Sequence, residues 1–229
     1  MEITAEKIMQ QLSAGTQVAG VIAVFGEEGY YKDKIAAALP RAVFGDAALE
    51  DREITVFERD TDIKEVSAAV NTYPFFSGRS LVIIKDEKLW GGKDGGEKRK
   101  QQQEELAELL ADVPEHCQVL LLGEKIDKRG KLYKSLLKTA AMVECKSLKS
   151  YQLKPWLDEQ AALRGCRFDY EASQTIMEYL SVTDNAPLLL LEQEIEKLSV
   201  YAGERKIWTK DDIEQTFAAL PEVSRFALL

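Results

Sequence analysis

The sequence predicts a parallel α/β domain followed by a small all-helical domain. Five short apolar segments lie between residues 21 and 143, and each is separated from the next by enough chain for a helix. After residue 145 the strand-like segments stop and only helix-like segments follow. A length of 229 residues suits one α/β domain and one smaller domain. We therefore expect two domains, each with its own core.

The apolar segments define the strands of the first domain. Residues 21–25, Val-Ile-Ala-Val-Phe, form a continuous apolar run that ends at Gly26. Such a run is typical of a strand that is buried on both faces of a parallel sheet. Similar segments follow at residues 54–57, 81–84, 119–122 and 140–143. Their spacing predicts an alternating α/β layout.

Helices are expected between these strands. Asp62 can cap a helix in which Ile63 and Val70 fall on one face. Leucines at helical spacing predict further helices at residues 101–111 and 131–138. These helices are the crossovers that parallel strands require. The segment directly after Met1 is polar and also helix-like.

The second half of the chain contains signals for helix ends. Pro187 suits a first helical turn, and Gly203 suits a helix end. Thr209, with Asp212 three residues later, forms a capping-box pattern. The predicted helices cover residues 151–163, 170–180, 187–201 and 210–219.

The domain boundary is expected near residues 146–150. We divide the chain into an α/β domain at residues 1–146, a helical lid domain at residues 147–221 and a short last segment at residues 222–229. A glycine-rich stretch at residues 91–96 predicts a mobile surface loop within the first domain.

The composition argues against several classes of protein. A net charge of −9 means that any contact with nucleic acid must be local. No apolar run approaches the roughly 18 residues of a membrane span, so we expect a cytoplasmic protein without a membrane partner. Cys117, Cys145 and Cys166 include no C-x-x-C pair, which argues against a disulfide framework and a zinc ribbon. His116, the single histidine, leaves little for histidine-based catalysis and is expected just before a strand.

The loop after the first strand has the position of a phosphate-binding P-loop. Active P-loops carry the pattern G-x-x-x-x-G-K-[ST], with backbone N–H groups around the phosphates. Gly26 and Lys32 match the first glycine and the lysine. Tyr31 replaces the second glycine, and Asp33 replaces the hydroxyl residue that binds magnesium. The two glutamates after Gly26 add negative charge, so we predict a degenerate P-loop that does not bind nucleotide.

Two further positions of an active NTPase site are also changed. Lys85 interrupts the acidic end of the strand at residues 81–84, so we expect a solvated strand end there instead of a magnesium site. Gly123 and Glu124 stand where a polar residue would sense the γ-phosphate. We therefore predict no catalytic residue, no metal and no cofactor.

Several segments resemble those of one family, the δ subunit of the bacterial DNA polymerase III clamp loader, a relative of AAA+ ATPases. The most specific segment is Tyr-Pro-Phe-Phe-Ser-Gly-Arg-Ser-Leu-Val at residues 73–82. The Gly-x-x-x-Tyr pattern at residues 26–30, the basic segment at residues 125–134 and Glu-Ile-Glu-Lys-Leu at residues 194–198 are similar to other family motifs. The resemblance covers essentially the whole chain and supports an AAA+/P-loop-like first domain.

The resemblance implies a non-hydrolysing subunit that binds the β sliding clamp and helps to open it for loading onto DNA during replication. Neighbouring loader subunits would hydrolyse ATP, and the assembly belongs to the DNA polymerase III holoenzyme. The family continues into a helical collar domain that holds the loader subunits together. Residues 222–229 look like the start of this domain, so we expect a truncated chain that does not assemble stably with those subunits.

The resemblance also identifies candidate clamp-binding residues. The family inserts an apolar pair into a hydrophobic pocket on the clamp, and Phe75 and Phe76 match this pair. Tyr73 and Pro74 would shape the loop, which we expect to lie near the degenerate P-loop. The pattern alone favours a different interpretation, in which both phenylalanines pack in the core or at a sheet edge.

One segment could contact DNA or an acidic partner surface. Residues 125–154 contain nine lysines and arginines but only two acids, so this is the only strongly positive part of the chain. The pattern alone also fits a solvated helix face. The candidate contact residues are Lys125, Lys128, Arg129, Lys131 and Lys134.

Two other functions remain open from the sequence. An active P-loop NTPase of the AAA+ type predicts tight binding of ATP and magnesium. A nucleotide kinase or a similar α/β enzyme would need an arginine-rich substrate pocket. The arginines of the first half outside the glycine-rich region are scattered: Arg41, Arg52, Arg59 and Arg79.

Overall fold

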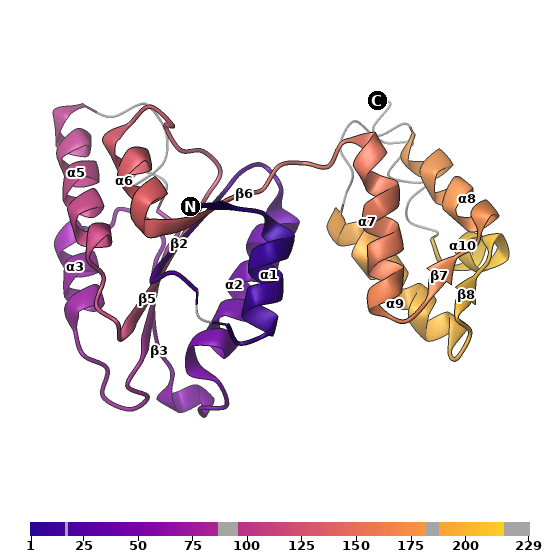
Figure 1. Cartoon of the computed structure of the whole chain (residues 1–229), viewed down its shortest axis with the longest axis horizontal. Coiled ribbons are helices and arrows are strands. Elements are labelled where there is room, and N and C mark those ends of the chain that lie inside the picture. The colour runs from indigo at the N-terminus through magenta and orange to yellow at the C-terminus, as the bar shows by residue number, and fades with distance from the viewer. Residues whose placement is uncertain (17, 87–95, 182–187, 218–229) are drawn as a thin grey trace. The chain divides into compact units, whose positions relative to one another are not determined.

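The computed structural model describes residues 1–16, 18–86, 96–181 and 188–217 (Figure 1). The chain divides into two compact units, Met1–Lys146 and Ser147–Leu229, which are considered separately below. Three predicted features lie wholly or mostly outside the described residues: the glycine-rich loop, of which only Gly96 is described, the helix start at Pro187, and the last segment at residues 222–229.

The first unit is built on a six-stranded sheet in the order β1-β6-β2-β5-β4-β3, and every neighbouring pair is parallel. The predicted α/β class is confirmed, because each predicted apolar segment is a strand of this sheet. The strands are β1 (Glu2–Ile3), β2 (Val21–Phe25), β3 (Glu53–Phe57), β4 (Ser80–Ile84), β5 (Cys117–Gly123) and β6 (Ala140–Glu144).

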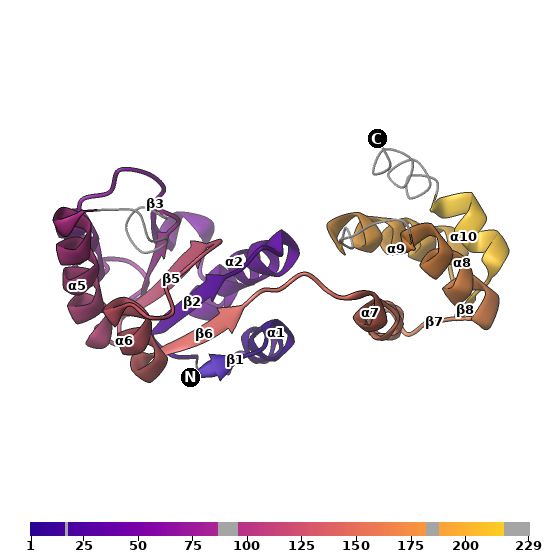
Figure 2. The same ribbon diagram turned by 90° about the horizontal axis from the view of Figure 1, so that it is seen from above.

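Helices cover both faces of this sheet (Figures 1 and 2). Helices α1 and α2 lie on one face, and α3, α5 and α6 lie on the other. Asp62 caps α3 as predicted, with its side chain accepting from the Lys64 N–H at 3.0 Å. The helices are α1 (Ala5–Ser13), α2 (Gly29–Phe44), α3 (Ile63–Asn71), α5 (Glu97–Ala111) and α6 (Lys131–Thr139), and a short 3-10 turn covers Leu49–Asp51.

The burial of each strand follows from its place in the sheet. Every residue of β2 and β4 is buried, because these strands have neighbours on both sides and helices on both faces. Strand β3 pairs only with β4, and its Ile54 and Val56 side chains are 39% and 44% exposed. An apolar run alone does not distinguish an edge strand from a central one, so the expectation that this run resembles the buried first strand is wrong.

The N-terminus holds an element that the sequence pattern did not predict. Strand β1 has only two residues, too few to form a recognisable apolar run, yet it pairs with Met142 and Val143 of β6. The N-terminal amine of Met1 donates to the carbonyl oxygen of Ala140 at 2.6 Å. Helix α5 also begins at Glu97, four residues before the predicted start.

The second unit is helical as predicted, with one addition. Two-residue strands, β7 (Arg167–Phe168) and β8 (Ile207–Trp208), form a parallel pair that the expectation of helices alone did not include. Gly203 directly follows α9 with a positive φ of 58°, as expected at a helix end. The helices are α7 (Ser150–Leu163), α8 (Tyr170–Leu180), α9 (Leu188–Ala202) and α10 (Lys210–Thr216). None of the helices in the described ranges is long and apolar enough to cross a membrane.

Candidate functional site

The degenerate P-loop connects β2 to α2. Gly26 has a φ of 131°, a conformation that side chains rarely adopt. A Cβ atom at this position would lie 2.0 Å from the carbonyl oxygen of Cys145, the residue that follows β6. Gly26 is therefore required by the close approach of two backbone segments, whether or not a phosphate is present.

Groups that would surround a phosphate are bonded within the protein. The Glu28 N–H donates to the Cys145 carbonyl oxygen at 3.1 Å, and the Tyr30 N–H donates to the Glu28 carboxylate at 2.9 Å. The Lys32 ammonium donates to the Gly26 carbonyl oxygen at 2.8 Å. Thus two backbone donors and the lysine already have partners within the first unit, either in the loop itself or at Cys145.

The remaining loop residues are also unsuited to a phosphate site. Tyr31 is buried within the unit, so its ring fills space beside the loop instead of leaving an open cradle. Asp33 is exposed on α2 and carries negative charge where a hydroxyl would bind magnesium. Burial raises the pKa of the neighbouring Cys145 thiol to about 12, although the Lys32 ammonium acts in the opposite direction.

The end of β4 differs from the predicted solvated strand end. Asp86 is only 3% exposed, and its carboxylate accepts from the Thr61 N–H at 2.9 Å. Lys85 is exposed and lies 3.5 Å from Glu58. The expectation of a solvated strand end was therefore right for Lys85 and wrong for Asp86. The reason is that the backbone at Thr61, just before α3, is hydrogen-bonded to the Asp86 carboxylate. Glu124, after β5, is exposed as an ordinary loop residue.

The loop between α3 and β4 projects two aromatic side chains from the surface. Phe75 is 87% exposed and Phe76 is 66% exposed. Their ring centroids lie 5.0 Å apart in an edge-to-face arrangement. The interpretation that both rings pack in the core or at a sheet edge is therefore wrong. We call residues 73–76 the aromatic tip.

Contacts on both sides of Pro74 hold the aromatic tip. Pro74 itself is buried. The Tyr73 ring packs against the His116 ring at 5.1 Å between centroids. On the other side, the Glu53 carboxylate accepts hydrogen bonds from the Phe75 and Phe76 N–H groups. The tip is thus attached to the residue before β5 and to the first residue of β3.

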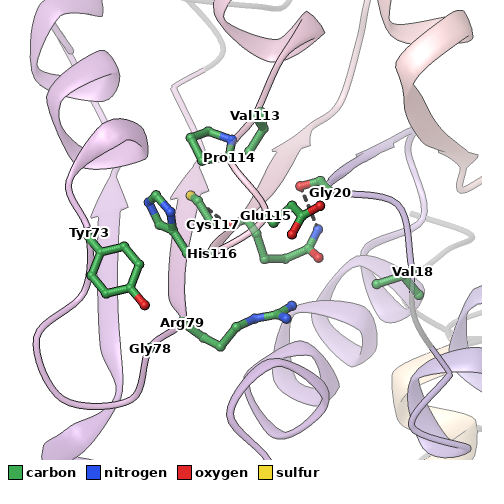
Figure 3. A pocket seen from close by; sticks show the side chains of 11 residues that line it. Val18, Gly20, Tyr73, Gly78, Arg79, Val113, Pro114, Glu115, His116 and Cys117 are labelled. Carbon is green, nitrogen blue, oxygen red and sulfur yellow. Dashed lines mark hydrogen bonds between the residues drawn. The ribbon is translucent and has the colours of Figure 1, made fainter.

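A pocket of about 600 Å³ lies beside Tyr73 (Figure 3). Figure 3 shows the Tyr73 and His116 rings on one side of this pocket, with Arg79 close by. The pocket opens where β4 and β5 begin, at the amino-terminal edge of the parallel sheet. The Gly26 loop follows the carboxyl-terminal end of β2, so the aromatic tip and the degenerate P-loop lie at opposite edges of the sheet. The expectation that they are neighbours is wrong.

The basic candidates do not form one uncompensated positive surface. Lys128 and Lys131 pair with Glu144 and Glu104 at 2.8 Å and 2.7 Å. Arg129 lies 3.7 Å from Asp127. Among the described residues, Lys125 and Lys134 have no ion-pair partner. The predicted segment also crosses from the first unit into the second, so it is not a single surface feature.

The ion pair between Lys128 and Glu144 shifts the pKa values of both groups. The hydrogen bond to Glu144 raises the pKa of Lys128. Burial acts to raise the pKa of Glu144, but bonds from Lys128 and Lys146 outweigh it, so the pKa of Glu144 is lowered. Both groups therefore stay ionised and paired at neutral pH.

Three residues beside these sites could not be identified from the sequence. Glu53 is 22 residues away from Phe75, and Cys145 is far from Gly26 along the chain. His116 was expected only to precede a strand, which it does, but its contact with Tyr73 depends on the neighbouring positions of β4 and β5. No local pattern marks any of these contacts.

Comparison with known proteins gives consistent results. The family model of the DNA polymerase III delta subunit matches residues 25–146. A curated relative, DNA polymerase III subunit delta of Bacillus subtilis (strain 168), is 28% identical over 216 residues. The match includes 93% of this chain and 61% of the relative, so the chain spans about three fifths of the length of that protein.

Solved structures share the fold. The Bacillus subtilis DNA clamp loader delta protein (YqeN) matches with a TM-score of 0.73 and 24% identity, over 92% of this chain and 61% of that chain. A chain of the HORMA:CdnC:Trip13 complex of E. coli MS115-1 matches with a TM-score of 0.53 and 14% identity, over 86% of this chain and 73% of that chain.

Proposed function

Because the chain belongs to the DNA polymerase III delta subunit family, we propose that it binds the β sliding clamp through the aromatic tip and helps to open it for loading onto DNA. Residues 1–146 are the clamp-binding domain in this proposal, residues 147–221 are the lid domain, and residues 222–229 begin a collar. The protein acts in the cytoplasm, and its other partners are the remaining loader subunits and, in the assembled complex, DNA.

The observation that carries this proposal is the exposure of Phe75 and Phe76. Large aromatic side chains are usually buried, and an adjacent exposed pair is a typical anchor for a pocket on a partner. Both rings extend from a loop whose backbone is held by Glu53 and by the Tyr73 contact. A held loop loses little conformational entropy when it binds.

The clamp-binding role is tested with purified β clamp and surface plasmon resonance. The double variant Phe75→Ala, Phe76→Ala should bind at least about 30-fold more weakly, because anchors of this type commonly contribute about 2 kcal/mol or more. Tyr170→Ala is the matched control, since Tyr170 is a 77% exposed aromatic residue of the second unit. Unchanged affinity in a correctly folded double variant would refute the role.

We also propose that the chain does not bind or hydrolyse nucleotide. Tyr31 fills space beside the loop, and Lys32 donates to the Gly26 carbonyl oxygen, so a phosphate would have to displace existing contacts. Equilibrium titration with a fluorescent ATP analogue and magnesium should show no saturable binding. Saturable, magnesium-dependent binding that Lys32→Ala removes would instead support the alternative of an active P-loop NTPase.

A further inference from the structure

The aromatic tip is bonded to an edge strand through one carboxylate. Glu53 is the first residue of β3, and its Oε1 atom accepts from two successive backbone N–H groups, those of Phe75 and Phe76. The bond from Phe76 measures 3.0 Å. Hydrogen bonds to an ionised acceptor are roughly twice as strong as those between neutral groups.

These two bonds restrain the backbone from which both rings project. Phe75 and Phe76 are exposed, so the hydrophobic effect does not favour this position of their side chains in the free protein. Because both amides donate to Glu53, the backbone of Phe75 and Phe76 is restrained while the two side chains stay exposed. The edge-to-face contact between the rings then becomes possible at the surface.

Glu53 is itself firmly placed. It pairs in register with Ser80, the first residue of β4, and the Ser80 N–H donates to the His116 carbonyl oxygen at 2.8 Å. The same histidine packs against Tyr73 through its ring. The tip is therefore held at two points, the start of β3 and the residue before β5, and these two strands flank β4 in the sheet.

We propose that Glu53 is a positioning residue that holds the aromatic tip in its binding conformation before the partner arrives. This inference rests on the proposed clamp-binding role of residues 73–76. It predicts a specific kinetic signature. If only a fraction of molecules carries a correctly arranged tip, the apparent association rate falls with that fraction, while the bound complex dissociates as before.

Variants of Glu53 separate charge, reach and acceptor ability. Glu53→Ala removes the acceptor, Glu53→Asp shortens its reach, and Glu53→Gln keeps an acceptor oxygen without the charge. The expected order of association rate is wild type, then Gln, then Asp and Ala. Glu50→Gln is the matched control, because it changes the net charge equally, and Glu50 is an exposed residue of the 3-10 turn next to β3.

Hydrogen exchange of the free protein measures the attachment directly. In NMR spectra, the Phe75 and Phe76 amides of Glu53→Ala should exchange at least about tenfold faster than in wild type, because their acceptor is gone. Amides of β4, such as that of Ile83, should be unchanged. Faster exchange throughout β4, or no change at the two phenylalanines, would overturn the proposal, since the first result indicates general destabilisation.

Clamp-binding kinetics provide the second readout. Glu53→Ala should associate about tenfold more slowly with β clamp and dissociate within about twofold of wild type. A faster dissociation with unchanged association would overturn the positioning role. If the wild-type chain does not bind clamp at all, the proposed function fails, and the exchange data then decide only whether Glu53 holds the loop.

Discussion

Gly26 is required by the packing of the first unit. Its positive φ and the 2.0 Å distance from an added Cβ to the Cys145 carbonyl oxygen leave no room for a side chain. The close neighbour is backbone, which cannot move aside as a flexible side chain can. A glycine that sequence comparison would assign to phosphate binding is therefore fully explained by the contact between the ends of β2 and β6.

We expect Gly26→Ala to reduce the free energy of unfolding by about 3 kcal/mol or more, since strain and a backbone clash occur together. Urea unfolding followed by circular dichroism measures this loss. Gly29→Ala is the control, because nothing lies within 4 Å of an added Cβ there and Gly29 is the first residue of α2. Equal stability of the two variants would contradict the packing explanation.

Helix α10 shows how a single side chain can fix an element. The Asp212 carboxylate accepts from the Thr209 N–H at 2.9 Å and forms an ion pair with Arg205 at 2.8 Å. The capping box predicted from Thr209 and Asp212 is confirmed. The Arg205 contact adds a second partner from the turn before β8, so the cap joins α10 to the rest of the second unit.

The pKa of Asp212 makes this cap pH-dependent. Burial acts to raise the pKa, but bonds from the Thr209 backbone, from the Arg205 side chain and from the Thr209 hydroxyl outweigh it, so the pKa lies below its ordinary value of 3.8. The ionised carboxylate therefore stabilises the folded unit above about pH 4, and the stabilisation is lost as the pH falls through the lower, folded-state pKa.

Asp212→Asn should lower the free energy of unfolding by about 1–2 kcal/mol at pH 7, because the helix cap is weakened and Arg205 loses its charged partner. The difference from wild type should shrink below about pH 4. Thermal unfolding at several pH values tests both statements. Asp211→Asn serves as the control, since Asp211 is an exposed neighbour in the first turn; a loss that does not depend on pH would argue against the charge effect.

At the scale of the whole molecule, the topology separates the two sites. In a parallel sheet, loops that follow strands lie at one edge and loops that precede strands lie at the other. The Gly26 loop and Asp86 belong to the first edge, and the aromatic tip and its pocket belong to the second. Substitutions in the degenerate P-loop can therefore accumulate without altering the residues that hold the aromatic tip.

The charge distribution limits contact with DNA. Three of the five basic candidates are paired with acids, which leaves Lys125 and Lys134 unpaired in the described part of the chain, and the net charge is −9. We expect the isolated chain to bind duplex DNA weakly, with a log–log salt slope no steeper than about −2, because each phosphate contact contributes about −0.9. Fluorescence anisotropy across a KCl series measures the slope.

The double variant Lys125→Ala, Lys134→Ala should reduce this slope to near zero, whereas replacing the paired Lys131 should change it little. A slope of about −4 or steeper would show that the ion pairs of Lys128, Arg129 and Lys131 open on DNA. In that case the paired lysines and arginine would contribute directly to binding.

The sequence by itself determined the elements whose signals are local. The apolar run of β2, the cap of α3 and the glycine after α9 depend on residues a few positions apart, and each was predicted. The changes at Tyr31 and Asp33 were visible for the same reason. Only the tertiary structure decided which strand is an edge, that the tip and the loop occupy opposite edges, and that Glu53 holds Phe75 and Phe76. These features depend on contacts between residues far apart in the chain, and local sequence patterns carry no record of such contacts.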